Sequence, residues 1–296
     1  MHTSVLLSEV IDGLDLKEGD LVLDGTLGLG GHSRGVCDHI GKTGQIVGLD
    51  QDKKAIDQAR ENLKECPCQV RLEKENFRNL DKVLDNLNIE HIDKAVFDLG
   101  FSSMQMDQSG RGFSFLKDEP LLMTLSDSPK TDELTASEIV NNWREESIAD
   151  IIYGYGEEQF SRRIAKSIVE ARKKHLITTT TQLVEIIEKS VPDWYRHKKI
   201  HCATKTFQAL RIAVNDELGA LAEGLKKCFK YLSVGGRMAV ISFHSLEDRT
   251  VKNFFRDKKK EGLLKLINKR PVTPTREETK VNPRARSSKL RIIEKI

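Results

Sequence analysis

Acidic residues follow two short apolar segments near the start of the chain, and a glycine-rich stretch lies between them. Asp24 follows Leu21–Leu23 and opens Asp24-Gly-Thr-Leu-Gly-Leu-Gly-Gly-His32, and Asp50 follows Ile46–Leu49. Strand, glycine loop, helix, strand and acid is the order of a nucleoside-cofactor site in a doubly wound α/β domain. A dinucleotide site has glycine where Asp24 stands, because the pyrophosphate must approach bare amides. A carboxylate would instead attract a sulfonium, which favours S-adenosylmethionine over NAD.

Four predicted strand ends would form one rim of such a sheet, because the carboxyl ends of parallel strands meet at one edge. Asp50 could accept both ribose hydroxyls, and Phe77, after the third strand, could stack on adenine. Asp98 ends the fourth strand, near the expected position of the reacting methyl group. Close backbone approach to the ligand is expected at Gly28, Gly30 and Gly31, and the helix begins near His32. The competing interpretation is turn glycines and helix-capping acids.

Further candidates lie in loops beyond this rim. In Ser109–Phe115, Arg111 could hold a phosphate. Phe113 and Phe115 could stack on an unpaired base, or both phenylalanines could anchor the loop on the core. His244 directly follows a predicted strand, where it could orient a substrate amine or take its proton, or equally cap the next helix. Phosphate contacts are also expected from three basic residues near the C-terminus, Arg284, Arg286 and Lys289.

The elements that must position these residues alternate regularly in the first hundred residues. Apolar runs at 21–23, 46–49, 70–72 and 95–99 are separated by segments with helical spacing, and further strands are expected at 237–243, 263–268 and 290–293. This predicts an α/β fold with a doubly wound, mostly parallel seven-stranded sheet and an antiparallel pair at its end. A mostly helical block at 107–205 interrupts the pattern, so 1–106 and 206–296 would form one domain and 107–205 an inserted domain. Capping residues Thr135 and Thr179 would begin two of its helices.

Composition narrows the class of protein. The 296 residues are 38% hydrophobic and 31% charged, with no apolar run near the roughly 20 residues that span a bilayer. The first nine residues lack the pattern of a signal peptide, so a cytoplasmic protein is expected. Five cysteines are then expected to be free thiols, and Cys66-Pro-Cys68 lacks a second pair at zinc spacing, so no metal is expected. The net charge is +3, but Arg249–Ile296 alone carries +11, which suggests a polyanion partner or a solvated lysine-rich segment.

Taken together, several motifs resemble the ribosomal RNA small subunit methyltransferase H family, also called MraW. They include Asp24-Gly-Thr-Leu-Gly-Leu-Gly-Gly-His-Ser, Asp98-Leu-Gly-Phe-Ser-Ser, Arg111-Gly-Phe-Ser-Phe, Tyr155-Gly-Glu-Glu, Ile241-Ser-Phe-His-Ser-Leu-Glu-Asp-Arg and Asn282-Pro-Arg-Ala-Arg-Ser. They occur in family order over essentially the whole chain.

The resemblance implies a class I methyltransferase fold with an inserted helical domain that recognises the substrate. It implies methylation of the exocyclic N4 of a cytidine in the decoding region of small-subunit (16S) ribosomal RNA, with S-adenosylmethionine as methyl donor and the RNA or the 30S particle as partner. It leaves the oligomeric state open, a homodimer included. Carried over by position, the cofactor contacts are Gly30, Gly31, His32, Asp50, Phe77, Asp98 and Gln105. Asp24 and Gly28 are added from the loop itself.

For catalysis we expect Asp98, or a backbone carbonyl near it, to accept a hydrogen bond from the amine N–H, with Ser102 or His244 assisting. Two segments depart from the family pattern, which puts RNA affinity and target choice in question. Acidic and basic positions are lost in Pro120–Ser126, at Leu122, Thr124 and Ser126, and His201–Thr206 has Cys202 and Lys205 in place of the family's residues. A small-molecule methyltransferase and a non-catalytic RNA-binding or ribosome-binding protein on the same fold remain alternatives.

Overall fold

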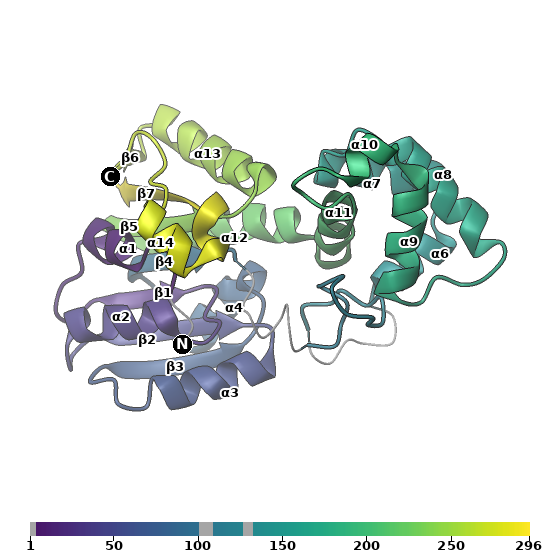
Figure 1. The fold of residues 1–296 in the computed structure, drawn as a ribbon. Coiled ribbons are helices and arrows are strands. Elements are labelled where there is room, and N and C mark those ends of the chain that lie inside the picture. Colours follow the sequence, from purple (N-terminus) through teal and green to yellow (C-terminus); the bar gives the residue numbers. More distant parts are fainter. Residues whose placement is uncertain (1–3, 101–108, 127–132) are drawn as a thin grey trace. The chain divides into compact units, whose positions relative to one another are not determined.

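The computed structural model describes residues 4–100, 109–126 and 133–296. They form two compact units, and the described elements of each are shown in Figure 1. The first unit combines 1–102 with 218–296, and the second is 103–217. The sequence placed the second boundary at 205/206, so helix α11 (Thr204–Asn215) was assigned to the wrong part of the chain. It packs on α7 (Glu145–Gly156) and therefore belongs to the inserted unit.

The first unit is built on a seven-stranded sheet in the order β3-β2-β1-β4-β5-β7-β6. The strands are β1 (Leu21–Asp24), β2 (Gln45–Asp50), β3 (Gln69–Lys74), β4 (Ile92–Asp98), β5 (Leu232–Ser242), β6 (Leu264–Leu266) and β7 (Lys289–Lys295). The first five are parallel, and β7 pairs antiparallel with both β5 and β6. The predicted α/β class and the seven strands are confirmed. β5 begins at Leu232, five residues before the expected start at 237, and the pair Gly235-Gly236 lies within the strand.

Helices cover both faces of this sheet, as the doubly wound pattern requires. Successive residues of β1 show why, because side chains alternate between the faces of a strand. Val22 packs with α2 (Gly31–Ile40), whereas Leu23 packs in the core beneath α4 (Leu80–Asn86) and α12 (Glu217–Tyr231). The remaining helices of this unit are α1 (Leu7–Leu14), α3 (Lys53–Asn62), α13 (Ser245–Lys260) and α14 (Arg276–Val281), with short 3₁₀ helices η1 (Phe77–Asn79) and η2 (Pro283–Ser287).

The second unit is helical in its described part. Its helices are α6 (Ala136–Asn142), α7, α8 (Ser161–Arg172), α9 (Thr180–Ser190), α10 (Asp193–Arg196) and α11. Thr135 and Thr179 cap α6 and α9 as predicted, the latter in a reciprocal capping box with Gln182. Trp143 and Arg144 are extended and separate α6 from α7.

The cysteines depart from the expectation of five free thiols. Cys37 of α2 and Cys66, in the connection between α3 and β3, are joined by a disulfide, while Cys68, Cys202 and Cys228 are free and buried. The crossover helix α2 lies beside the segment that enters β3. Cys37 and Cys66, which are 29 positions apart in the sequence, therefore meet. Spacing along the chain gives no sign of this pairing. Among the described residues, no helix is long and apolar enough to cross a membrane.

Candidate active site

Three aspartates end the three adjacent strands β2, β1 and β4. In the sheet register Asp24 is level with Gly48 of β2 and Val96 of β4. Asp50 and Asp98 therefore lie two residues further along their strands, one on each side of the loop that leaves β1. A strand advances about 3.3 Å per residue, so the two outer carboxylates project beyond the inner one.

This register fastens the glycine loop on both sides. The Gly28 amide donates to Oδ2 of Asp50 at 2.9 Å, and the Asp98 amide donates to Oγ1 of Thr26 at 2.5 Å. Gly28 and Gly30 have backbone φ angles of +51° and +78°, which residues other than glycine rarely adopt. The loop is thus held in one conformation before any ligand binds.

Asp24 lies beneath this loop and is only 2% exposed. Its Oδ2 accepts a hydrogen bond from the Ser33 hydroxyl at 2.6 Å, and Oδ1 accepts one from the Thr26 amide at 3.2 Å. Burial raises the pKa of the Asp24 carboxyl, and these two donors and the nearby His32 oppose that shift. Asp24 therefore braces the loop and also supplies negative potential under it.

Asp50 has both carboxylate oxygens on backbone amides, Oδ2 on Gly28 and Oδ1 on Asp52, each at 2.9 Å. Burial raises the pKa of this carboxyl to about 6, against the two amide hydrogen bonds, which lower it. A carboxylate oxygen has a second lone pair, so each could still accept from a ribose hydroxyl. Its charge would then be lost in mildly acidic solution.

His32 connects the start of α2 to Asp98. Its Nε2 lies 3.0 Å from the carbonyl oxygen of Val5, which can only accept, so Nε2 carries the hydrogen. Nδ1 lies 3.6 Å from Oδ2 of Asp98, and the His32 side chain is buried while that of Asp98 is 20% exposed. A Cβ at Gly31 would meet the Ser4 hydroxyl at 2.1 Å, so the N-terminal segment also lies close against the loop.

Phe77 begins η1 just beyond β3. Its ring packs edge-on against Phe97 with centroids 5.7 Å apart, and it also faces Gly224 of α12, where a Cβ would come within 2.6 Å of the ring. Phe77 is partly buried at the margin of the core. The predicted adenine-stacking residue is thus held firmly at the same edge of the sheet as the acids.

His244 takes the capping role that the sequence left open. It is the N-cap of α13, and its Nδ1 accepts from the Glu247 amide at 3.4 Å. The Glu247 carboxylate accepts a hydrogen bond from the His244 backbone amide at 3.2 Å. Its other oxygen lies 3.1 Å from Nε2 of His244. Both ring nitrogens thus face Glu247. Ser102 and Gln105, the other two predicted site residues of this region, lie outside the described residues.

Comparison with known proteins decides the family. The family model described as the MraW methylase family matches residues 1–296. Two curated proteins named ribosomal RNA small subunit methyltransferase H, from Brevibacillus brevis and Clostridium botulinum, are each 42% identical to this chain over all of its length, and over 98% and 99% of theirs.

The chain belongs to the MraW methylase family. It is accordingly a methyltransferase of the S-adenosylmethionine-dependent class, and the resemblance drawn from its motifs is confirmed. An rRNA methylase from Streptococcus thermophilus matches in structure with a TM-score of 0.44 and 12% identity, over 98% of this chain and 92% of that one, a likeness too low to add to the assignment.

The basic tail of this MraW methylase contains residues that are paired within the first unit. Lys289 lies 3.4 Å from the Asp248 carboxylate, which also pairs with Arg291 at 2.7 Å. Lys295 donates to the backbone carbonyls of Phe229 and Leu232 near the end of α12. Lys289, Arg291 and Lys295 are thus paired within the first unit.

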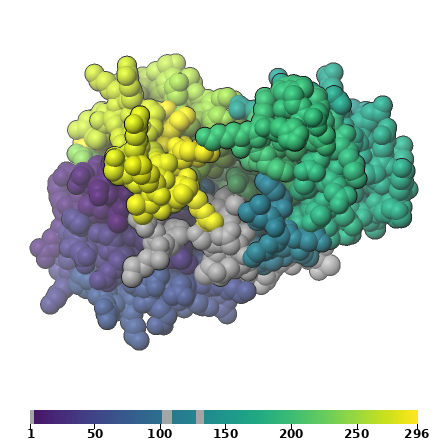
Figure 2. Space-filling model, viewed as in Figure 1, coloured from purple at the N-terminus to yellow at the C-terminus, as the bar shows by residue number. Residues whose placement is uncertain are grey.

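Arg284 and Arg286 are exposed on η2, whose Ala285 is buried as its anchor. The segment from α14 to η2, yellow in Figure 2, lies on the surface of the first unit beside the purple N-terminal residues. One contact between them is the Leu6 amide, which donates to the Glu278 carboxylate at 2.8 Å. These two arginines are therefore accessible to a polyanion.

Arg111 and Phe113 are instead buried in the second unit. The Arg111 guanidinium donates to the Leu125 carbonyl at 2.8 Å and lies over the Phe113 ring, 5.5 Å from its centroid. Phe115 packs on His201 and Phe207. These side chains hold the loop on the helical core, which was the alternative to RNA contact.

Sequence reasoning missed two groups of residues. Thr26 and Ser33 hold the acids of the rim, and their positions inside the loop and the first helical turn were the available signal. Trp194 of α10 is 58% exposed, with the Lys198 ammonium 4.7 Å from its ring centroid. An exposed aromatic ring beside a cation is typical of single-stranded nucleic-acid contacts, and no spacing in the sequence marked it.

Proposed function

We propose that this MraW methylase transfers a methyl group from S-adenosylmethionine to the exocyclic N4 of a cytidine in the decoding region of small-subunit ribosomal RNA. The observation that carries the proposal is the row of carboxylates at the ends of β2, β1 and β4 around a glycine loop held from both sides. The names of the curated relatives, ribosomal RNA small subunit methyltransferase H, support small-subunit ribosomal RNA as the substrate, and the cytidine N4 target is what the motif resemblance implies. A ribosomal substrate also implies a cytoplasmic location.

In this proposal each acid has a separate task. Asp50 accepts the two ribose hydroxyls, and Phe77 lies beside the adenine. Asp24, buried under the loop, provides the negative potential that favours a sulfonium over an uncharged thioether. Gly28, Gly30 and Gly31 let the backbone approach the methionine portion closely, and Gln105 is the remaining expected contact.

The amine of cytosine is a poor nucleophile, because its lone pair is delocalised into the ring. Methyl transfer from a sulfonium is an in-line displacement, so the nitrogen must be held close to the methyl carbon with an acceptor on its N–H. We assign that acceptor to Asp98, the rim acid that His32 faces at 3.6 Å. A fixed charge there stabilises the positive charge that develops on nitrogen. Ser102 remains a second candidate in the same loop, whereas His244 is engaged with Glu247.

The base must leave its stack to reach this rim, as base-modifying enzymes generally require. We propose that exposed Arg284 and Arg286 bind phosphates on the first unit, and that Trp194 with Lys198 offers a stacking surface on the inserted unit. Lys289 contributes less, because Asp248 already neutralises it. Arg111 and Phe113 are not assigned to RNA binding, because both side chains are buried.

Methyl transfer measured with labelled S-adenosylmethionine tests the proposal. Small-subunit RNA or 30S particles should be methylated, and binding should weaken steeply as salt rises, because phosphate contacts release counterions. Asp98→Asn should retain S-adenosylhomocysteine binding and lose turnover at saturating cofactor, whereas His244→Asn, which keeps a capping side chain, should retain turnover. Full turnover by Asp98→Asn would contradict its role. Methylation of small amines without RNA would favour the small-molecule alternative.

A further inference from the structure

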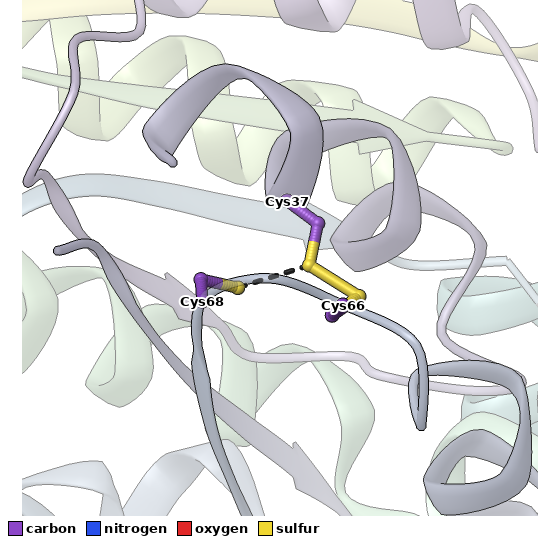
Figure 3. Close-up of side chains that lie close together, drawn as sticks. All are labelled: Cys37, Cys66 and Cys68. Atoms are coloured by element: carbon purple, nitrogen blue, oxygen red, sulfur yellow. Dashed lines mark hydrogen bonds between the residues drawn. A yellow bond between two sulfur atoms is a disulfide. The ribbon is translucent and has the colours of Figure 1, made fainter. Parts of the chain in front are cut away.

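The sulfurs of Cys37, Cys66 and Cys68 lie close together (Figure 3). Cys37 is bonded to Cys66, and the free thiol of Cys68 lies 2.9 Å from the Cys37 sulfur. Cys37 and Cys68 are buried, whereas Cys66 is partly exposed. Cys37 therefore stands between two possible partners.

The surroundings of Cys66 and Cys68 suit reversible chemistry at the surface. Both line a pocket of about 540 Å³, together with the basic side chains Arg60 and Lys64. The Arg34 guanidinium lies 3.6 Å from the Cys66 sulfur, where it would stabilise a thiolate. Burial raises the pKa of the Cys68 thiol, whereas Cys66 is partly exposed and lies beside a guanidinium.

A structural zinc site fits this cluster less well. Such sites take four ligands, and in the described part of the chain the cluster comprises only these three cysteines. His39, also on α2, is exposed and has its Nδ1 2.9 Å from the Gly35 carbonyl. Three sulfurs, two of them bonded, match a disulfide with a third, exchanging thiol.

We propose that Cys37, Cys66 and Cys68 form a reversible oxidation site, in which Cys37 pairs with either of the other two and a peroxide is the oxidant. The Cys66 thiolate attacks the peroxide, whose O–O bond breaks to leave a sulfenic acid and a hydroxide. The hydroxide takes up the proton that the Cys66 thiol lost on ionising and becomes the first water. The Cys37 thiol then displaces the hydroxyl as a second water and closes the disulfide. Exchange moves no net electrons: Cys68 attacks Cys37, and Cys66 leaves as thiolate beside Arg34. A low-molecular-weight dithiol reverses the oxidation and becomes a disulfide itself.

The position of the cluster connects it to the cofactor loop. Cys37 lies on α2, whose first residue is Gly31, and Cys66 follows the end of α3 closely. There the Asn62 side-chain amide donates to the Leu29 carbonyl at 2.9 Å, and Leu63 would lie 3.1 Å from a Cβ at Gly30. The disulfide thus ties the two segments that support the loop, so oxidation is expected to favour the cofactor-binding conformation.

Mass spectrometry of alkylated full-length protein tests the pairing. Cys66 and Cys68 share one tryptic peptide, 65–71, so single variants must separate them. After brief peroxide treatment, Cys68→Ser should cross-link Cys37 to Cys66. Cys66→Ser should cross-link Cys37 to Cys68 on longer treatment, because Cys37 or Cys68 must then attack the peroxide in place of Cys66. Cys37→Ser should form neither bond, and Cys228→Ser, a buried cysteine elsewhere, should behave as wild type. Failure of Cys66→Ser to cross-link would overturn the exchange.

Further measurements distinguish this oxidation site from a metal site and from a disulfide that has no effect on cofactor binding. Oxidised wild type should melt roughly 5–10 °C above the dithiol-reduced form, because the bond closes a loop of about 30 residues, and it should bind S-adenosylhomocysteine more tightly. Equal affinities would overturn the coupling to the loop, which rests on the assigned cofactor site and not on the RNA substrate. One equivalent of zinc in the purified reduced protein, lost from Cys37→Ser, would overturn the disulfide chemistry altogether.

Discussion

Cofactor affinity is expected to depend on pH through Asp50. Burial raises the pKa of this carboxyl to about 6, so it is ionised above that pH and protonated below it. The ionised form is the better acceptor for the two ribose hydroxyls and for the Gly28 and Asp52 amides it already holds. Affinity is therefore present above pH 6 and lost as the pH falls.

The size of the effect follows from that pKa. With a value of about 6, the ionised fraction falls from roughly nine-tenths at pH 7 to one-tenth at pH 5. If only the ionised form binds, the dissociation constant rises about tenfold over this interval, which is about 1.4 kcal/mol.

Titration calorimetry with S-adenosylhomocysteine measures this loss directly. That ligand has the same ribose but no sulfonium, so its attraction to Asp24 does not contribute. Asp50→Asn should bind more weakly at pH 7 and show no pH dependence between 7 and 5. Asp57→Asn, which alters an exposed acid of α3, should keep the wild-type dependence. A flat wild-type profile, or an unchanged slope in Asp50→Asn, would refute the role given to Asp50.

Three other variants test separate parts of the account. Asp24→Asn should weaken S-adenosylmethionine at least fivefold more than S-adenosylhomocysteine, about 1 kcal/mol, and equal losses would mean that its charge does not sense the sulfonium. Gly30→Ala should lower the free energy of unfolding in urea by about 1–2 kcal/mol, because φ is +78° and Leu63 lies close; unchanged stability would show that the loop adapts. Arg286→Gln should reduce the salt dependence of RNA binding by about one counterion, and Lys289→Gln, already paired with Asp248, by less; the opposite order would move the phosphate site.

The sheet and its acidic rim could be predicted from the sequence, because both depend on residues that are neighbours in the chain. Short apolar runs that end on an acid define a strand and the residue at its end, and Asp24, Asp50 and Asp98 all lie there. The capping residues Thr135 and Thr179 were also predictable, since a cap depends on neighbours a few positions away.

Three features could not be predicted from the sequence, because each depends on contacts between residues far apart in the chain. The disulfide joins Cys37 to Cys66 across a crossover, and no local spacing encodes it. Arg111 and Phe113 have the composition of a ligand loop, yet both are buried in the folded chain, and Arg111 is bonded to the Leu125 carbonyl. The boundary near 205 was misplaced because α11 is amphipathic whichever unit it joins, and only its packing on α7 decides.

The central claim is that the carboxylate rim of this MraW methylase serves methyl transfer to a cytidine amine in small-subunit ribosomal RNA. Nucleoside mass spectrometry of that RNA, from cells that carry the gene, lack it, or carry Asp98→Asn, tests it most directly. The account predicts N4-methylated cytidine at one decoding-region position in the first sample and its loss in the other two. The same modification in all three samples, or none in the first, would contradict it.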